Sequence, residues 1–296
     1  MIRNYHTHTW RCGHARDTER EYVESAIAGG LKELGFSDHS PMPYPNGYIS
    51  PVRMRVDQLE DYVSTVLALR EEYKDDIDIH LGLEAEYFPD LFEELLELLS
   101  PYPFEYLLLG QHFLGNEQGA PYVGMPIRDE TILQWYTWQC QEAILTGCFS
   151  YIAHPDVFYY AGDGASYEKW ARELCRSAKQ AQLPLEINFL GLGERRHYPN
   201  DAFWKVAGQE GNKVIFGADA HCRANVVRPD VEAEAQQIVG RYGLSLTDQV
   251  RLRRPSLETY RKNQGRLHPE RIRGCSASQR QALENLRRAR EDAKSR

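Results

Sequence analysis

The sequence predicts an α/β fold with a parallel sheet, and three observations support this prediction. Apolar segments of strand length alternate with helical patterns through residue 242. Seven such units follow one another, which is typical of serial βα architecture. The chain has 296 residues, 42% of them hydrophobic, which is enough for a sizeable core. These observations leave two architectures open, a closed barrel and an open doubly wound sheet.

Each predicted strand is a short and largely apolar segment. In chain order the seven segments are Ile2–His6, Leu34–Asp38, Ile77–Glu84, Tyr106–Gln111, Phe149–Ala153, Pro184–Asn188 and Lys213–Ala218. The predicted helices between and after them are Thr18–Ala28, Asp57–Tyr73, Leu91–Leu99, Asp129–Thr146, Tyr167–Gln182, Asp201–Gln209 and Pro229–Tyr242. Two of these helices begin with an apparent capping residue. Thr18 is followed three residues later by Glu21, and Asp57 by Glu60.

Two segments depart from the alternating pattern. Residues 40–56 are rich in Pro, Tyr, Asn and Gly, and this loop is either a lid over a site or a plain surface excursion. The pattern also fades after Leu244, so we expect a catalytic domain over 1–245 and a basic, partly helical extension over 246–296. Residues 276–296 are highly charged and form either a solvated terminus or a contact with a partner or a second copy of the chain. The sequence is thus compatible with a homo-oligomer.

The charge of the chain is unevenly distributed. The net charge is −8, but residues 241–296 contain 15 Lys and Arg against 6 Asp and Glu, which leaves 20 against 37 in residues 1–240. Such an acidic body argues against a nucleic-acid partner. Metal ions could supply the positive charge that an anionic substrate would need.

Several features predict a cytoplasmic protein with no membrane partner. No run of 18 apolar residues is present, and the N-terminus has no apolar segment typical of a signal peptide. The six cysteines form no C-x-x-C pair, which favours free thiols in a reducing compartment. Cys12 and Cys222 lie close to histidine motifs, so sensitivity to oxidation is a further hypothesis.

The placement of the histidines indicates the chemistry. Seven of the ten histidines lie at or just beyond the carboxyl end of a predicted strand, namely His6, His8, His14, His39, His112, His154 and His221. Glu84 and Asp219 also end predicted strands. Sites in barrels and doubly wound sheets form at this edge. A lone histidine is more often structural, but seven so placed are poorly explained by chance.

These residue types are suited to binding divalent metals. In His6-Thr7-His8 the two imidazoles lie on the same side of an extended segment and can share one ion, and Asp219-Ala220-His221 repeats this spacing. Imidazoles and carboxylates without thiolates suit Zn²⁺, Fe or Mn²⁺. Of the remaining histidines, His80 is expected within a strand, His268 at the surface, and His197 beside the pocket.

The ordered motifs resemble those of the polymerase-and-histidinol-phosphatase (PHP) family over roughly residues 1–245. They are His6-Thr7-His8, Ser37-Asp38-His39, Gly82-Leu83-Glu84, Gly110-Gln111-His112, Ala153-His154-Pro155-Asp156, Glu186-Ile187-Asn188 and Gly217-Ala218-Asp219-Ala220-His221. Within the family, the sequence is most similar to the monofunctional histidinol-phosphate phosphatases. The resemblance implies a distorted (β/α)7 barrel with a metal site at the carboxyl ends of its strands.

The resemblance also implies three divalent metal ions and a ligand set. The first ion would take His6, His8, Glu84 and Asp219, the second Glu84, His112 and His154, and the third His14, His39 and His221. Glu86 is the alternative to Glu84 as the bridging carboxylate. Three divalent ions and two carboxylates would leave a site charge of about +4 that attracts phosphate and acidifies a water for attack at phosphorus.

The resemblance further suggests residues around the metals. Asp38 and Asp156 adjoin histidines in their motifs, so they are expected either to orient imidazoles or to transfer protons, and Glu84 is expected to contribute to catalysis. Arg195 or Arg196 would contact the phosphate, beside His197.

The favoured activity is hydrolysis of L-histidinol phosphate, a step of histidine biosynthesis. The alternative is a related phosphoesterase acting on another small ester, such as a nucleotide or sugar phosphate. A proofreading-type nuclease fits the acidic body poorly. A non-catalytic metal-binding regulator would not need nine competent ligand positions.

Overall fold

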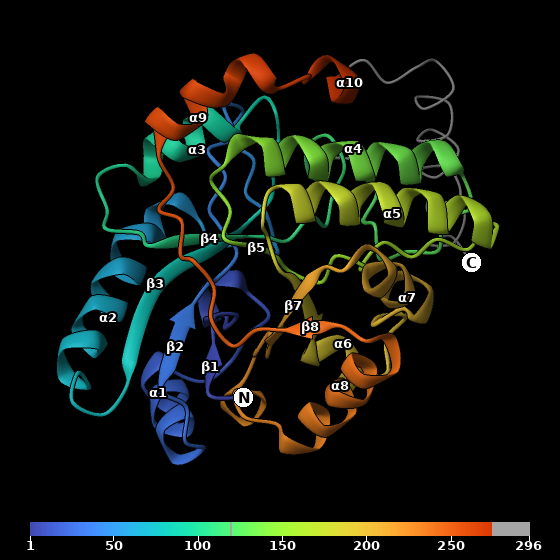
Figure 1. Ribbon diagram of the computed structural model, residues 1–296. Helices are drawn as coiled ribbons and strands as arrows, with labels where there is room; N and C mark the ends of the chain where they lie inside the picture. Colours follow the sequence, from blue (N-terminus) through green and yellow to red (C-terminus); the bar gives the residue numbers. More distant parts are fainter. Residues whose placement is uncertain (119, 274–296) are drawn as a thin grey trace, which may run out of the picture.

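The computed structural model describes residues 1–118 and 120–273, and its centre is one sheet of eight parallel strands arranged in sequence order (Figure 1). Parallel strands need crossover connections, and helices supply most of them. The strands are β1 (Arg3–Asn4), β2 (Glu33–Phe36), β3 (Asp78–Ala85), β4 (Tyr106–Leu109), β5 (Tyr151–Ile152), β6 (Leu185–Asn188), β7 (Lys213–Gly217) and β8 (Ser245–Leu246).

The helices lie around the outside of the sheet (Figure 1). They are α1 (Glu19–Ala28), α2 (Leu59–Glu72), α3 (Phe92–Leu99), α4 (Glu130–Thr146), α5 (Gly164–Gln180), α6 (Phe189–Gly193), α7 (Asp201–Glu210), α8 (Pro229–Tyr242), α9 (Leu257–Asn263) and α10 (Glu270–Arg273). All seven predicted helices are present. Helix α6 was not predicted from the sequence, and α9 and α10 lie in the extension that was expected only to be partly helical.

The two ends of the barrel close differently. Beyond the carboxyl ends of β1 and β7, Thr7 and Ala220 form a parallel bridge, in which Ala220 N–H donates to His6 C=O at 3.2 Å and His8 N–H donates to Ala220 C=O at 3.0 Å. At the opposite end β8 pairs with the start of β7, between Lys213 and Ser245. The sheet is therefore closed as a seven-stranded barrel at one end and carries an eighth strand at the other, so the predicted distorted barrel is confirmed.

The core has two parts. A large apolar layer packs between the sheet and the surrounding helices. A smaller cluster around Tyr106 and Tyr151 fills the barrel interior, and Val250 and Leu252 pack against it. The chain after β8 thus helps to close the barrel at the end opposite the histidine motifs.

The two capping predictions, for Thr18 and Asp57, can be compared with the observed starts of α1 and α2. Thr18 caps α1, and its hydroxyl and the Glu21 carboxylate form the reciprocal capping box, as predicted. The prediction for Asp57 is wrong, because a 3-10 turn over Val56–Gln58 precedes α2 and no side chain caps that helix.

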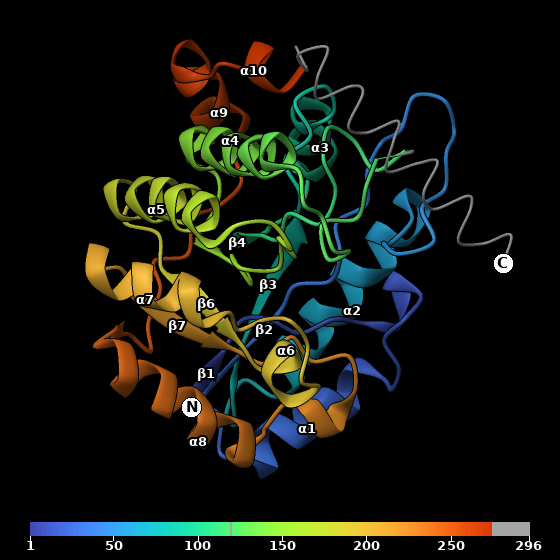
Figure 2. The ribbon, with the colours of Figure 1, turned by 90° about the vertical axis from the view of Figure 1, so that its right-hand side faces the viewer.

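The C-terminal segment packs on the barrel more closely than expected. The predicted boundary at residue 245 falls within β8. Helices α9 and α10 lie over α4, and α5 runs beside α4, as both views show (Figure 2). Tyr260 of α9 is buried and contacts the ring of Phe92, with ring centroids 5.6 Å apart. The charged segment predicted over 276–296 lies outside the described residues.

The loop over residues 40–56 is held against the loop that follows β4. The buried carboxylate of Glu117 accepts hydrogen bonds from Tyr44, Tyr48 and Ser50 and an ion pair from Arg53 at 2.6 Å. In the part of the chain described, no helix combines the length and apolar character needed to cross a membrane.

Candidate metal centre

The nine predicted ligands come together at the carboxyl ends of the strands. Glu84 lies within β3, and seven others follow β1, β2, β4, β5 or β7 within a few residues. His14 instead comes from the loop after a short 3-10 helix, Trp10–Cys12. The cluster consists of His6, His8, His14, His39, Glu84, His112, His154, Asp219 and His221.

Glu84 lies at the centre of this cluster. Its Oε1 is 2.8 Å from His154 Nε2 and 3.7 Å from His112 Nε2. Its Oε2 is 3.0 Å from His39 Nδ1, and the Nε2 atoms of two further rings lie 3.5 and 3.6 Å away, those of His8 and His6. Burial alone would raise the pKa of Glu84, but the surrounding imidazoles, with His39 first, hold it well below its usual value. The carboxylate is therefore ionised and placed to bridge ions.

Asp219 forms the second anionic point of the cluster. Its Oδ1 lies 3.0 Å from His8 Nε2 and 3.5 Å from His6 Nε2. The backbone is strained here, since Asp219 has a φ of 48° and His154 a φ of 29°. Non-glycine residues adopt positive φ at a cost and mostly where function requires it.

A third group of imidazoles lies beside Asp219. Single ring nitrogens of His14, His39 and His221 all lie within 4.8 Å of one another. Burial first, and then the neighbouring His8, lower the pKa of His221 to about 3, and burial also lowers the pKa values of His14 and His39. These rings are therefore neutral near pH 7, which is the form that binds a cation.

Several buried atoms of the cluster lack hydrogen-bond partners in the described chain. They are Glu84 Oε2, Asp219 Oδ1, His154 Nδ1 and His221 Nε2. Buried polar atoms are almost always paired, so such a group requires an explanation. Lone pairs from imidazole and carboxylate that converge on shared points fit divalent ions such as Zn²⁺, Fe or Mn²⁺.

A buried carboxylate behind the cluster was not assigned a role from the sequence. Glu186 of β6 lies with Oε1 2.8 Å from His6 Nδ1, and its Oε2 accepts the His154 backbone N–H at 3.0 Å. Asn188 Nδ2 donates to Glu186 at 2.9 Å and to Asp219 at 3.1 Å. Glu186 and Asn188 thus orient two motifs at once. Their two-residue spacing at the end of a buried strand was the available signal.

Asp38 also lies behind the ligands. Its Oδ1 is 3.4 Å from His8 Nδ1 and accepts the His39 backbone N–H at 2.8 Å, while Thr9 Oγ1 donates to Oδ2. This placement corresponds to the expected orienting role rather than to proton transfer in the cavity.

Asp156 faces away from the cluster. Its Oδ2 accepts the indole N–H of Trp204 at 2.9 Å and the backbone N–H of Asn200 at 2.6 Å, where α7 begins. Burial raises the pKa of Asp156 to about 6. The expected catalytic role of Asp156 therefore needs correction, because the side chain anchors α7.

A cavity of about 520 Å³ opens onto the cluster. Six of the nine clustered residues contribute to its wall, namely His14, His39, Glu84, His112, Asp219 and His221. The remaining wall is partly aromatic and partly charged, and includes Val52, Arg53, Glu86, Phe113, Tyr122, Glu194, Arg196 and Tyr198. Val52 and Arg53 belong to the 40–56 loop, which therefore covers part of the site.

The PHP domain model matches residues 4–189. The chain belongs to the PHP family.

Curated relatives agree with this PHP assignment. The chain is 30% identical to a probable histidinol-phosphatase of Deinococcus radiodurans, over 73% of this chain and 85% of that protein. It is 32% identical to the histidinol-phosphatase of Bacillus subtilis, over 76% of this chain and 95% of that protein.

A solved structure is similar to the PHP fold described above. It is the histidinol phosphate phosphatase of Lactococcus lactis subsp. lactis, complexed with zinc, L-histidinol and phosphate. The TM-score is 0.62 at 20% identity, over 83% of this chain and 95% of that chain. At this identity the similarity concerns the fold.

The structure separates the two arginines of the PHP chain that were considered for phosphate binding. Arg195 pairs with Glu234 at 2.7 Å on the outer surface, whereas Arg196 lines the cavity. His197 also lies outside this cavity, because its Nε2 is 2.7 Å from Val157 C=O and its ring stacks on Tyr159. Arg195 and His197 are therefore not placed as the expected substrate contacts.

Glu86, the alternative bridging residue, is already engaged. Its Oε1 lies 3.1 Å from Arg53 Nη2 and 3.3 Å from His112 Nδ1, and its Oε2 accepts the Phe113 backbone N–H at 3.2 Å. This geometry favours Glu84 as the bridge of the PHP site and assigns Glu86 to orienting His112.

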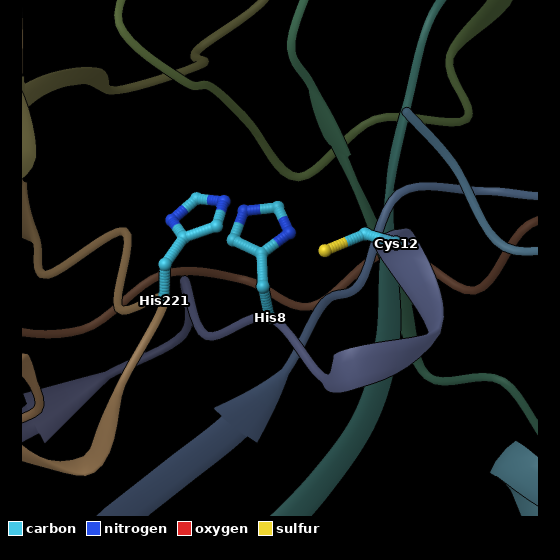
Figure 3. Close-up of side chains that lie close together, drawn as sticks. All are labelled: His8, Cys12 and His221. Carbon is cyan, nitrogen blue, oxygen red and sulfur yellow. The ribbon is translucent and has the colours of Figure 1, made fainter. Parts of the chain in front are cut away.

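Cys12 lies beside His8 and His221 of the PHP cluster. Figure 3 shows its sulfur directed toward the His8 ring, with His221 stacked on the other side. Cys12 is fully buried, and burial raises the pKa of its thiol. Reactive cysteines are exposed thiolates, so this environment argues against the hypothesis of oxidation at Cys12. Among the described residues, all five cysteines are free.

Proposed function

We propose that this chain is a metal-dependent phosphatase that hydrolyses L-histidinol phosphate to L-histidinol and phosphate. The observation that carries the proposal is the cluster of nine ligand side chains, six of which line one cavity together with Arg196. Two curated relatives at 30% and 32% identity, each aligned over about three quarters of this chain, are named a probable histidinol-phosphatase and a histidinol-phosphatase.

The clustered side chains fit three divalent ions of Zn, Fe or Mn. We assign His6, His8, Glu84 and Asp219 to the first, Glu84, His112 and His154 to the second, and His14, His39 and His221 to the third. When bound, such ions supply Lewis-acid charge to phosphoryl oxygens and lower the pKa of water.

The chain's own residues prepare the substrate and the ligands. Arg196 is held by Glu194, with 2.9 and 2.7 Å contacts, and by the Tyr198 hydroxyl at 3.2 Å, so its guanidinium is positioned for phosphoryl oxygens. Glu186, Asp38 and Glu86 fix the directions of ligand imidazoles from behind. Val52 and Arg53 of the 40–56 loop form part of the cavity wall.

Assay of the purified protein against a panel of phosphomonoesters tests the substrate. We expect kcat/KM for L-histidinol phosphate to exceed that for nucleotide, sugar and aryl phosphates by about 100-fold or more. Turnover of L-histidinol phosphate no faster than that of an aryl phosphate would contradict the proposed substrate. It would still be compatible with a phosphatase of broad specificity.

We also propose that the protein acts in the cytoplasm on this small substrate and not on nucleic acid. The acidic composition of residues 1–240 supports the second point. Under conditions of full phosphatase activity, we expect no detectable cleavage of single-stranded DNA.

A further inference from the structure

Two carboxylates line the cavity beyond the metal cluster, and they differ in what they already bind. Both oxygens of Glu86 have partners within the chain, namely Arg53, His112 and the Phe113 backbone. Arg53 is in turn paired with Glu117 through Nε, and its Nη1 is left without a hydrogen-bond partner among the described residues, so the free polar atom of this group is a donor. A ligand that enters the cavity would therefore meet no free carboxylate oxygen here.

Glu194 is different. Its Oε2 receives both Nε and Nη2 of Arg196, at 2.9 and 2.7 Å. Its Oε1 has no hydrogen-bond partner in the described part of the chain. The side chain is 51% exposed, and it lines the same cavity as the metal cluster. The residue directly follows α6, whose start is fixed by the Asn188 side chain, which accepts the Gly191 N–H at 2.9 Å.

The Glu194 carboxylate is therefore placed both to hold Arg196 and to contact a ligand in the cavity. An ester whose phosphate binds Arg196 would place the substituents of its nearby carbons beside the guanidinium and its partner Glu194. A free carboxylate oxygen at that point favours a cation. The clustered ions, in contrast, would repel a positively charged part of the substrate.

We propose that Glu194 determines specificity by binding an ammonium group on the carbon next to the ester carbon of the substrate. The proposal rests on the proposed function, and it names the part of the leaving group that the enzyme recognises. L-Histidinol phosphate carries an ammonium at this position. Glu194 also positions Arg196, so its loss should affect all esters somewhat and amino esters most.

A comparison of two small inhibitors isolates the contribution of the ammonium group to binding. O-Phosphoethanolamine and ethyl phosphate differ in having an ammonium or a hydrogen on the second carbon. Their inhibition constants are measured against hydrolysis of an aryl phosphate by the metal-loaded enzyme. In the wild type we expect O-phosphoethanolamine to bind about tenfold more tightly. In Glu194→Gln we expect this ratio to fall to within about twofold of unity, while Glu194→Asp retains part of it.

Glu234→Gln is the matched control. Glu234 also forms an Arg pair, with Arg195, but on the outer surface away from the cavity. The ratio should keep its wild-type value in this variant. A ratio near unity in the wild type, or an unchanged ratio in Glu194→Gln, would overturn the inference and leave Glu194 as a support for Arg196 alone.

The substrate panel separates this outcome from failure of the proposed function. L-Histidinol phosphate could prove a poor substrate while the inhibitor ratio still depends on Glu194, in which case the enzyme uses another amino ester. Efficient turnover of L-histidinol phosphate with a ratio independent of Glu194 would refute only the role of Glu194.

Discussion

At the scale of single residues, the cluster depends on side chains that do not themselves reach the cavity. Glu186 is fully buried and contacts both the His6 ring and the backbone of His154. Carboxylates in this position fix the tautomer and direction of a ligand imidazole and raise its basicity. The quality of the metal site is thus partly determined by a residue behind it.

Replacing Glu186 with Gln tests this dependence. Because the carboxylate that faces His6 Nδ1 is lost, we expect metal affinity and kcat to fall by about 10- to 100-fold. Metal content of the dialysed protein and steady-state kinetics would measure both. Unchanged metal content and unchanged kcat would show that Glu186 only fills space.

Gly110 is required by the position of Glu84. A Cβ added at Gly110 would lie 1.7 Å from Glu84 Oε1, so the carboxylate would have to move. A displacement of this size at reacting groups costs about 100-fold in rate. The Cδ and Cγ of Glu84 would also be too close, at 2.4 and 2.7 Å, so the whole side chain would have to move. We therefore expect Gly110→Ala to lose about that much activity.

Gly240→Ala in α8 is the control for this substitution. A Cβ at Gly240 meets nothing within 4 Å, so activity should be unchanged. If Gly110→Ala retained wild-type kcat/KM and metal content, Glu84 would not need its present position.

Site residues were predictable from the sequence where the sheet geometry alone places them. His6, Glu84 and Asp219 end or follow parallel strands, and such ends meet at one edge. The direction of a side chain was not predictable in this way. Asp156 lies two residues from His154, yet the tight turn there directs its carboxylate to Trp204.

The two adjacent arginines show the same limit. Arg195 has a φ of 55°, which lies in the left-handed region, and Arg195 and Arg196 make contacts on different sides of the chain. Strand spacing contains no information about such a turn, so the sequence left the choice between them open.

At the scale of elements, the 40–56 loop is the clearest case of a segment held by charge. Glu117 is 5% exposed and is the common acceptor for four side chains of this loop. The buried carboxylate therefore attaches the covering loop to the segment after β4.

Glu117→Gln should loosen this attachment. A neutral amide weakens the contact with Arg53, so we expect the free energy of unfolding to fall by about 2 kcal/mol. Limited proteolysis within residues 40–56 should become faster, and urea denaturation would measure the stability. The exposed pair of Glu72 with Arg20 is the comparison, and Glu72→Gln should cost less than about 1 kcal/mol.

The elements that the sequence did not predict are short. β8 has two exposed residues and α6 has five residues, so neither has the length over which hydrophobic periodicity becomes visible. The long helices, in contrast, were found with ends within a few residues, because their apolar faces repeat over several turns.

At the scale of the whole molecule, the cluster brings many ionisable groups into the interior. His6, Glu84 and Asp219 are almost completely buried, and unpaired lone pairs remain among them. A bound cation would satisfy these groups in the folded state only, and such binding stabilises the fold.

Metal removal is therefore expected to lower the melting temperature by roughly 5–10 °C. Differential scanning calorimetry before and after dialysis against a chelator measures the change, and added Zn²⁺ should reverse it. A melting temperature that stayed the same after confirmed loss of metal would mean that bound ions do not contribute to the stability of the fold.

The bridge between Thr7 and Ala220 has a consequence for the synthesis of the protein. It hydrogen-bonds the first histidine motif to the last one, although they stand near opposite ends of the barrel sequence. A ribosome makes the first motif early and the last one late, and pairing between such distant segments is slow. The nascent chain therefore exposes His6 and His8 long before Asp219 and His221 exist, and a complete metal site can arise only once the barrel has closed.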